Sequence, residues 1–531
     1  DVRSAFADKP NLSWISRVNR GVAVWDGHVF ATTSDCRLIS LDAATGKRQW
    51  TKQTCDNDQG YSVSDSPYVG GGRVFVGNAG SESEKNNRGY ISAYDADDGN
   101  LDWRFFIVPS HKPEENDTPA LKMAAKTWTG DVLEKNGGGG NSWNEMTYDP
   151  ISNQLFFGTS GSHKYMYQER SPGGGDNLFL TSIVAISAET GEYNWHYQTV
   201  DKDSWDYNAT MNIVLADLNI DGEDRETVLI APKNGFHYAI DRHTGELLTA
   251  GKYAKANWAT HINMETGRPN YDPEAEYWAA EDDAEVLFWP NYWGAHGWNP
   301  MAFHPQLGLS YIPVVDLPSA VNNGGTGEDV VMFTELDGVP HHPGKLVAFD
   351  PATQSIRWTV GRALPYNGGL MATAGNLVFQ GSAEGHFQAF AADTGAQLWS
   401  VQTGSAINAA PASYSLDGKQ IVLIPIGTGG GLQFVYPQMH STDKSNGPTR
   451  LLAFSLNGQS SMPAPAAGYP PLPDQPMLDA SAEIVAHGKA LYGGYCKSCH
   501  GFEAVTRFGG SVPDLRYSND DTHAAWHGIV V

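Results

Sequence analysis

The sequence is poor in positive charge, in cysteine and in long hydrophobic runs. Its 531 residues include 35 Lys and Arg against 60 Asp and Glu, which gives a formal net charge of −25. Such a chain has no basic stripe to neutralise phosphates, and this excludes a nucleic-acid binder. No run of about 18 apolar residues occurs, so we expect no transmembrane segment. Asp1 opens directly into polar sequence without an initiator Met or a signal peptide, so we expect a processed form or a fragment.

A repeated hairpin pattern is the main feature that the chain does contain. With 40% hydrophobic and 18% charged residues the chain is not disordered. One pattern recurs six times: an alternating apolar strand, an Asp or small residue, Thr-Gly or an equivalent, and a strand usually closed by Trp. The Gly permits a positive φ in a tight turn, and the Trp can cover a neighbouring unit. The copies are residues 38–50, 90–103 and the stretches that end at Trp195, Leu248, Trp358 and Trp399.

These hairpins predict an all-β fold of the β-propeller class. Most copies are about 40 to 55 residues apart, and two larger gaps can each hide a degenerate copy. In a propeller, four-stranded antiparallel sheets pack around an axis, and ligands bind on loops from many blades. Functional residues are therefore expected to be scattered along the sequence.

The composition changes near Leu456, which divides the chain into three parts. Residues 1–455 are the predicted propeller, and residues 456–477 are rich in Pro, Ala and Ser and predict an extended linker. Residues 478–531 begin with a helical pattern that leads to Cys496, Cys499 and His500 in the order CKSCH. Two thiols two residues apart, followed by His, are typical of covalent haem c attachment with His as the iron ligand.

Two other interpretations of this motif, half a zinc site and a redox dithiol, are weaker. A zinc site needs further ligands, and no cysteine follows Cys499; a thioredoxin-like dithiol needs a βαβ context, which is missing. No Met follows either, since the last is Met477. His523 or His527 can serve as the second axial ligand, but a truncated, mainly α cytochrome c domain is the simpler expectation.

Several stretches carry a specific resemblance to a known family. They are residues 18–30 (VNRGVAVWDGHVF), 170–185 (RSPGGGDNLFLTSIVA), 203–210 (DSWDYNAT) and 231–242 (APKNGFHYAIDR). In these the chain resembles the PQQ-dependent quinohaemoprotein alcohol dehydrogenases, in which a propeller that carries pyrroloquinoline quinone (PQQ) and a divalent metal is fused to cytochrome c. The resemblance implies an eight-bladed propeller, of which this chain lacks the first strands, and a cytochrome domain without its last residues.

The resemblance implies a cofactor site for the planar, tri-anionic PQQ. Trp143 matches the tryptophan on which PQQ stacks, Arg20 matches an arginine that pairs with a PQQ carboxylate, and Ser64, with Ser66, matches small residues that line the site. A core aromatic is the alternative for Trp143, and a solvated turn is the alternative for the serines.

The resemblance also implies the metal ligands and the catalytic groups. Glu82 matches the metal-binding glutamate, with Glu84 as a rival, and Asp206 matches the aspartate that touches the metal and removes the hydroxyl proton of the substrate. Lys233 matches the cation that bonds the quinone oxygens, with a solvated turn lysine as the alternative. Asn208 replaces the second Asp of lanthanide-preferring members, so calcium (Ca²⁺) is expected.

Three positions complicate this assignment. The family has adjacent cysteines where this chain has Trp14 and Ile15. It has a metal-binding Asn where this chain has Gly161, and Ser160 or Ser162 can substitute for that ligand.

Residues 217–224 (DLNIDGED) lack the closing Glu of an EF-hand, so a solvated hairpin is the better interpretation.

Cys36 and Cys55 lie in adjacent hairpin arms. They can form a structural disulfide in an oxidising compartment or remain buried thiols. Residues 288–300 are rich in aromatics and suit either a greasy entrance or blade packing.

These observations predict a periplasmic enzyme that oxidises an alcohol to an aldehyde or ketone. Electrons would pass from PQQ to haem c and then to an external cytochrome, cupredoxin or quinone. The alternative is a degenerate propeller that serves as a binding or assembly module without dehydrogenase activity.

Overall fold

The computed structural model describes most of the chain. The described residues are 18–81, 85, 87–162, 164–281, 284–321, 329–330, 335–336, 339–427, 447–462, 471–474, 480–492, 496, 504, 514–519 and 521–525. Two compact units share them: one holds the described residues up to Ala363 together with Ala372–Val378 and Ala391–Ala396, and the other holds the rest.

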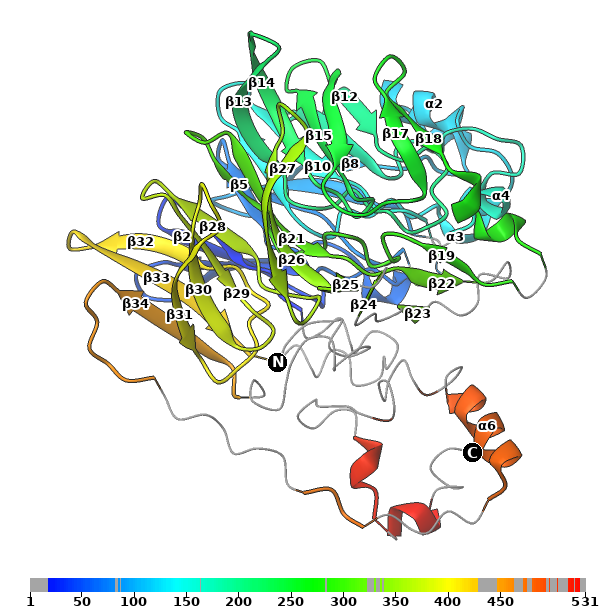
Figure 1. The fold of residues 1–531 in the computed structure, drawn as a ribbon. Helices are drawn as coiled ribbons and strands as arrows, with labels where there is room; N and C mark the ends of the chain where they lie inside the picture. Colours follow the sequence, from blue (N-terminus) through cyan, green and yellow to red (C-terminus); the bar gives the residue numbers. More distant parts are fainter. Residues whose placement is uncertain are drawn as a thin grey trace. The chain divides into compact units, whose positions relative to one another are not determined.

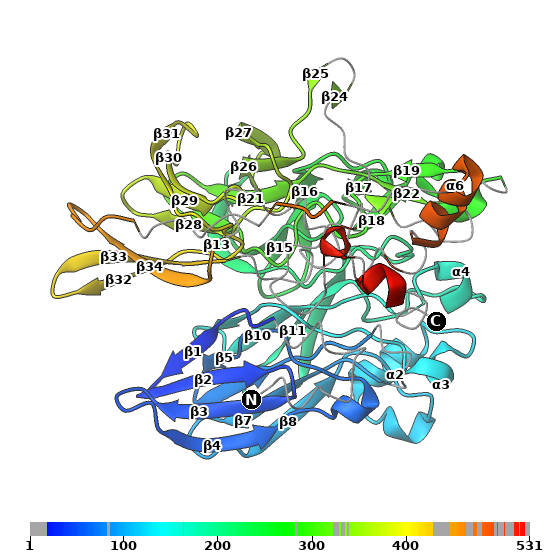
Figure 2. The ribbon, with the colours of Figure 1, turned by 90° about the horizontal axis from the view of Figure 1, so that it is seen from below.

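The first unit contains five four-stranded antiparallel sheets in which sequence neighbours are spatial neighbours (Figure 1). Figure 2 shows β1 to β4 of the first sheet side by side. The sheets are β1 (Val22–Trp25), β2 (His28–Thr33), β3 (Arg37–Asp42) and β4 (Arg48–Gln53); β5 (Tyr68–Gly70), β6 (Arg73–Val76), β7 (Tyr90–Asp95) and β8 (Leu101–Phe106); β9 (Met146–Asp149), β10 (Gln154–Gly158), β11 (Ser182–Ser187) and β12 (Tyr193–Gln198); β13 (Val214–Ile220), β14 (Glu223–Ile230), β15 (Phe236–Asp241) and β16 (Leu247–Lys252); and β20 (Ala302–His304), β21 (Leu309–Val315), β26 (Gly344–Asp350) and β27 (Ser355–Arg362).

Shorter elements lie in the connections of this unit. The strands form the sheets β17 (Ala259–Asn263) with β18 (Arg268–Tyr271), β19 (Val286–Phe288) with β22 (Ser319–Val321) and β23 (Asp329–Val330), and β24 (Glu335–Leu336) with β25 (Val339–Pro340). The helices are α2 (Pro119–Ala125), α3 (Val132–Asn136), α4 (Tyr167–Arg170), η3 (Asn57–Gln59), η4 (Pro113–Glu115), η5 (Pro273–Ala275) and η6 (Tyr277–Ala279).

Two further sheets follow in the sequence. They are β28 (Leu370–Thr373), β29 (Leu377–Gly381), β30 (His386–Ala391) and β31 (Gln397–Gln402), and then the three strands β32 (Ala412–Leu416), β33 (Lys419–Ile426) and β34 (Arg450–Ser455). The β-propeller class is confirmed, with seven blade sheets among the described residues besides the three small sheets in the connections. The eight-blade count is not confirmed. The described part of residues 478–531 contains α6 (Ala482–Leu491), where the helical pattern predicts it, and η11 (Leu515–Tyr517).

All six predicted hairpins are present, as the last two strands of their sheets. In the first copy, Asp42 Oδ1 accepts hydrogen bonds from the Thr45 N–H at 2.7 Å and from the Thr45 hydroxyl at 2.6 Å. This side chain holds a turn that Gly46 completes at φ +69°, a left-handed conformation that favours glycine. The Asp-x-x-Thr-Gly pattern is therefore a turn motif with a defined hydrogen-bond arrangement.

Four of the closing tryptophans dock onto the turn of the next sheet. Trp195 Nε1 donates to the carbonyl of Arg242 at 3.0 Å, and a Cβ added to Gly245 would lie 2.7 Å from the Trp195 ring. Only glycine leaves room for an indole this close to the backbone. Equivalent contacts join Trp50 to Gly99, Trp103 to Gly191 and Trp358 to Gly395. The prediction that these tryptophans cover neighbouring units is confirmed.

Two smaller predictions are also decided. Cys36 and Cys55 form a disulfide, so the alternative of two free thiols is wrong. Residues 217–224 span the antiparallel β13–β14 hairpin, as predicted.

Candidate functional site

A buried ion pair lies in the first unit, between the loop that follows β12 and the loop that follows β14. Lys233 Nζ donates to Asp206 Oδ2 at 2.7 Å and to the carbonyl of Tyr292 at 3.2 Å. The Lys233 side chain is 6% exposed and that of Asp206 is 24% exposed. A Cβ added to Gly294 would lie 2.4 Å from Lys233 Cγ, so the lysine stem is packed against backbone. The interpretation of Lys233 as a solvated turn lysine is therefore wrong.

Asn208 connects this ion pair to Trp143. The Asn208 amide nitrogen donates to Asp206 Oδ1 at 2.6 Å, and Trp143 Nε1 donates to Asn208 Oδ1 at 3.1 Å. Asp206 itself has φ +61°, an uncommon conformation for a residue with a side chain. The indole and the carboxylate are thus held in one hydrogen-bonded chain.

Arg20 and Ser64 meet at the backbone of Trp143. Arg20 Nη1 donates to the Ser64 carbonyl at 2.8 Å and to the Trp143 carbonyl at 3.3 Å, and the Ser64 hydroxyl donates to the same Trp143 carbonyl at 3.1 Å. The guanidinium carbon lies 5.1 Å from the ring centre of Trp143 and 5.7 Å from that of Trp298. Five predicted site residues therefore converge: Arg20, Ser64, Trp143, Asp206 and Lys233.

Burial shifts the pKa values of Arg20 and of two carboxyl groups near it. Burial lowers the pKa of Arg20 to about 10, although the charges of Asp65 and Glu145 act in the opposite direction. Burial raises the pKa of both carboxyls to about 7. Arg20 Nε is buried and has no hydrogen-bond partner among the described residues. This guanidinium retains the capacity to bind an anionic group.

A second carboxylate faces Asp206 across Gly161. A Cβ added to Gly161 would lie 3.3 Å from Asp203 Oδ2 and 3.7 Å from Asp206 Oδ1. Burial, with the charge of Asp206, raises the pKa of Asp203 to about 6. Ser160 Oγ donates to the Gly161 carbonyl at 3.2 Å, whereas Ser162 Oγ is buried without a partner among the described residues. The described residues contain no group of three His, Cys, Asp or Glu that could hold a metal ion.

The remaining predicted residues are only partly described. Glu82, Glu84, Trp14, Ile15, Cys499 and His500 lie outside the described residues. Cys496 is half-buried and forms no disulfide. Ser66 is half-buried, and its Cβ lies 3.2 Å from the position of a Cβ added to Gly21.

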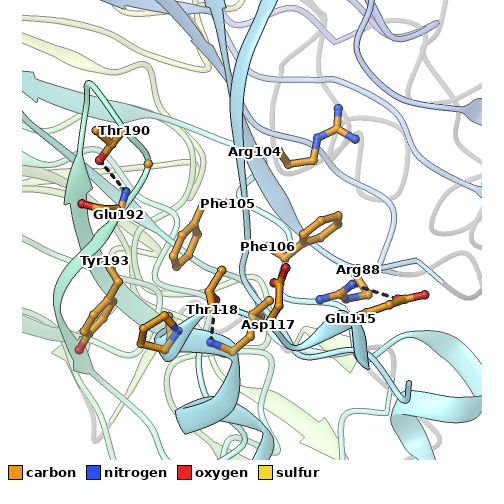
Figure 3. A pocket seen from close by; sticks show the side chains of 14 residues that line it. Arg88, Arg104, Phe105, Phe106, Glu115, Asp117, Thr118, Thr190, Glu192 and Tyr193 are labelled. Carbon is orange, nitrogen blue, oxygen red and sulfur yellow. Dashed lines mark hydrogen bonds and ion pairs between the residues drawn. The ribbon is translucent and has the colours of Figure 1, made fainter. Parts of the chain in front are cut away.

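A pocket of about 790 Å³ lies elsewhere in the first unit and is lined by none of the predicted site residues. Figure 3 shows Arg88 paired with Glu115 beside Phe106, and Thr190 and Glu192 on the opposite wall. Arg88 Nη1 and Glu115 Oε2, 3.7 Å apart, form an ion pair between two residues that line the pocket. The predicted site residues meet around Asp206 and Lys233 and not at this pocket.

Three residues of the site were not predicted from the sequence. The sequence gives Asn208 a meaning only for metal preference, gives Asp203 no role, and does not distinguish Trp298 from the other aromatics of residues 288–300. The spacing of Asp203 and Asp206 in one short segment was the available signal for a second carboxylate. Nothing in the sequence places Trp298 next to Arg20, because 278 residues separate them.

Comparisons with known proteins identify the family of the chain. The model of the PQQ glucose/ethanol/alcohol dehydrogenase β-propeller domain matches residues 6–256 and 338–422. The quinohemoprotein alcohol dehydrogenase ADH IIB of Pseudomonas putida is 42% identical, over 98% of this chain and 76% of the relative. The structure of ADHIIG from the same species superposes with a TM-score of 0.86 at 39% identity, covering 98% of this chain and 79% of that one. The Comamonas testosteroni quinohemoprotein alcohol dehydrogenase gives 0.82 at 36% identity, covering 96% and 77%. The chain belongs to the family of PQQ-dependent quinohemoprotein alcohol dehydrogenases.

Proposed function

We propose that the protein oxidises an alcohol to an aldehyde or ketone with PQQ and Ca²⁺, and passes the electrons through haem c to an external cytochrome, cupredoxin or quinone. The observation that carries this proposal is the continuous set of contacts from Lys233 through Asp206 and Asn208 to Trp143 and Arg20. Family membership supports the choice of substrate class.

The residues present fit the cofactor and the metal. A flat aromatic quinone with three carboxylates needs an aromatic face and cations, and the site offers the indole of Trp143 and the guanidinium of Arg20 with its unpartnered Nε. Hard oxygen ligands suit Ca²⁺, and Asp206 Oδ1 faces away from the lysine that binds Oδ2. Trp143, Arg20, Ser64 and Lys233 would hold PQQ, Asp206 with Glu82 would hold Ca²⁺, and Cys496, Cys499 and His500 would hold the haem.

When bound, PQQ would supply the acceptor for the two electrons of the alcohol, and Ca²⁺ would supply Lewis-acid chemistry. Asp206 takes the hydroxyl proton of the substrate at a carboxylate oxygen. Lys233 orients that carboxylate through the 2.7 Å contact. A charged donor in such a site also stabilises negative charge that develops on a neighbouring oxygen. Ser64 fixes the Trp143 backbone, and with it the indole plane.

The disulfide between Cys36 and Cys55 supports a periplasmic location. Disulfides persist in oxidising compartments, and covalent haem attachment fits the same side of the membrane. Within the described residues, no helix is long and apolar enough to cross a membrane.

Haem absorbance in the full chain tests the proposal. We expect ethanol or another alcohol to reduce c-type haem bands only after PQQ and Ca²⁺ have been added. Asp206→Asn should slow this reduction by a factor of about 10² to 10⁴, the usual contribution of a general base. The exposed-hairpin variant Asp217→Asn is the control and should behave as the parent protein. Haem that dithionite reduces but a broad panel of alcohols does not would contradict the proposal and favour a non-catalytic binding module.

A further inference from the structure

We propose that Asp203 is an additional carboxylate ligand of the calcium site and replaces the amide ligand that the family carries at the position of Gly161. This inference rests on the proposed function, because it assumes that Asp206 binds Ca²⁺. It concerns a residue that the resemblance leaves without a role.

The position of Gly161 supplies the first argument. A single point, the Cβ position of residue 161, lies 3.3 Å from Asp203 Oδ2 and 3.7 Å from Asp206 Oδ1. An asparagine there would send its side chain outward from this point, between the two carboxylates. Because residue 161 is glycine, no side chain separates this point from the Asp203 Oδ2 atom. Ca²⁺ accepts six to eight oxygens at about 2.3–2.6 Å in flexible geometry, so small movements bring both carboxylates to one cation.

The hydrogen bonds of Asp203 supply the second argument. Its Oδ1 accepts from the backbone N–H groups of Trp205 and Tyr207, each at 3.1 Å. These contacts fix the carboxylate plane. Its Oδ2, in a residue that is only 4% exposed, accepts no hydrogen bond from the described residues. This acceptor oxygen faces Gly161, where it is available to a bound cation.

The surrounding cations do not satisfy this oxygen. Arg170 is buried beside the loop, but its Nη2 donates to the backbone carbonyl of Asp203 at 2.7 Å, and its other nitrogens bond Asn177 Oδ1 and two backbone carbonyls. Lys233 binds Asp206 at Oδ2, the oxygen other than the one nearest to Gly161. The two oxygens that face Gly161 therefore repel each other with no cation of the described residues between them. A divalent cation removes this repulsion.

Neutral oxygens also lie near Gly161. The Cβ position of Gly139 lies 2.9 Å from the Gly161 carbonyl oxygen, 3.0 Å from Ser162 Cα and 3.2 Å from Ser81 Cβ. Ser162 Oγ is buried and unpartnered among the described residues, so it can complete an oxygen shell.

Calcium binding to the full chain reconstituted with PQQ tests the inference, with isothermal titration calorimetry as the readout. Asp203→Asn retains an Oδ1 that can accept both backbone N–H groups, and it removes only the charge and the second acceptor. We expect the Kd for Ca²⁺ to rise at least tenfold. A purely structural role for Asp203 predicts no such change. The matched control is Asp149→Asn, because Asp149 is also buried and also caps backbone and hydroxyl groups of a turn, and its Kd should stay within twofold of the parent.

Asp206→Asn separates the two levels of the argument. If Asp206→Asn weakens Ca²⁺ binding and Asp203→Asn leaves it within twofold of the parent, the assignment of Asp203 is wrong and the proposed metal site stands. If neither variant alters binding, the proposed metal site is wrong as well.

A crystal structure of the unaltered chain grown with Ca²⁺ gives an answer that does not depend on the folding of a variant. Asp203 Oδ2 at about 2.3–2.6 Å from the cation supports the inference. A cation bound by Asp206 with Asp203 Oδ2 beyond about 3.5 Å overturns it.

Discussion

Replacing Lys233 by Met is the sharpest test of the ion pair at the centre of the site. Methionine keeps most of the buried stem that packs against Gly294 but removes the ammonium group, and with it the contacts to Asp206 at 2.7 Å and to the Tyr292 carbonyl at 3.2 Å. Hydrogen bonds to charged groups contribute about 1.5–3 kcal/mol each. Because Asp206 is 24% exposed, water can solvate its carboxylate in the variant. We therefore expect the free energy of unfolding to fall by about 3 kcal/mol, the lower limit for the loss of the two hydrogen bonds.

The same substitution should affect catalysis more strongly than substrate binding. Loss of one preorganised donor next to developing negative charge typically lowers kcat by a factor of about 10² to 10³. Dye-linked alcohol oxidation at saturating PQQ and Ca²⁺ measures kcat and KM, and we expect KM to change less than threefold. Lys233→Arg serves as the comparison, because it restores the charge and should recover part of kcat. A Lys233→Met protein that binds PQQ and retains kcat within threefold of the parent would refute the reasoning.

Three further outcomes are expected. Trp195→Ala should lower the free energy of unfolding by about 3–5 kcal/mol in chemical denaturation, whereas Trp399→Ala, at a residue that is 40% exposed, should lower it by much less; equal effects would contradict the role of the indole contact. Burial raises the pKa of Asp65 to about 7 from 3.8. Between these two pH values the folded chain keeps a proton on Asp65 that the unfolded chain has released. The contribution of this group to the free energy of unfolding therefore falls as the pH rises from about 4 to 7. In the absence of PQQ, Asp65→Asn should therefore stabilise the chain by up to about 4 kcal/mol near pH 8 and by little near pH 4. Urea titrations at both pH values measure this, and a larger stabilisation at pH 4 than at pH 8 would contradict the prediction. Reduction of the Cys36–Cys55 bond, which spans 19 residues, should lower stability by about 3 kcal/mol, with the Cys36→Ser/Cys55→Ser double variant unaffected by reductant in the same thermal melt.

The repeated hairpins were predictable because their information is local. An Asp that caps its own turn, a glycine at positive φ and an alternating strand all lie within about a dozen residues, and each has a physical reason that the sequence displays. The closing tryptophans were predictable in kind, although their partner glycines in the next sheet were not.

The site was predictable in part, through a resemblance and not through pattern alone. Arg20, Ser64, Trp143, Asp206 and Lys233 meet as expected, yet spacing along the chain places none of them beside another. Asp203 shows why the rest could not be foreseen. Its role depends on the approach of the loop around Gly161, about 40 residues earlier, and on which of its two oxygens the Trp205 and Tyr207 amides leave free. Such information arises only when loops pack.

The docking of each tryptophan onto the glycine turn of the following sheet has a consequence for how such chains can change. The join is the same small chemical unit each time: an indole N–H, a backbone carbonyl and a missing side chain. A sheet that has both the turn glycine and the closing tryptophan can contact the sheet before it and the sheet after it in the same way. Such a sheet can be duplicated, or exchanged between homologues, without a new kind of contact. A substitution at one of these contacts therefore disturbs the packing of two sheets, because the indole belongs to one sheet and the glycine turn to the next.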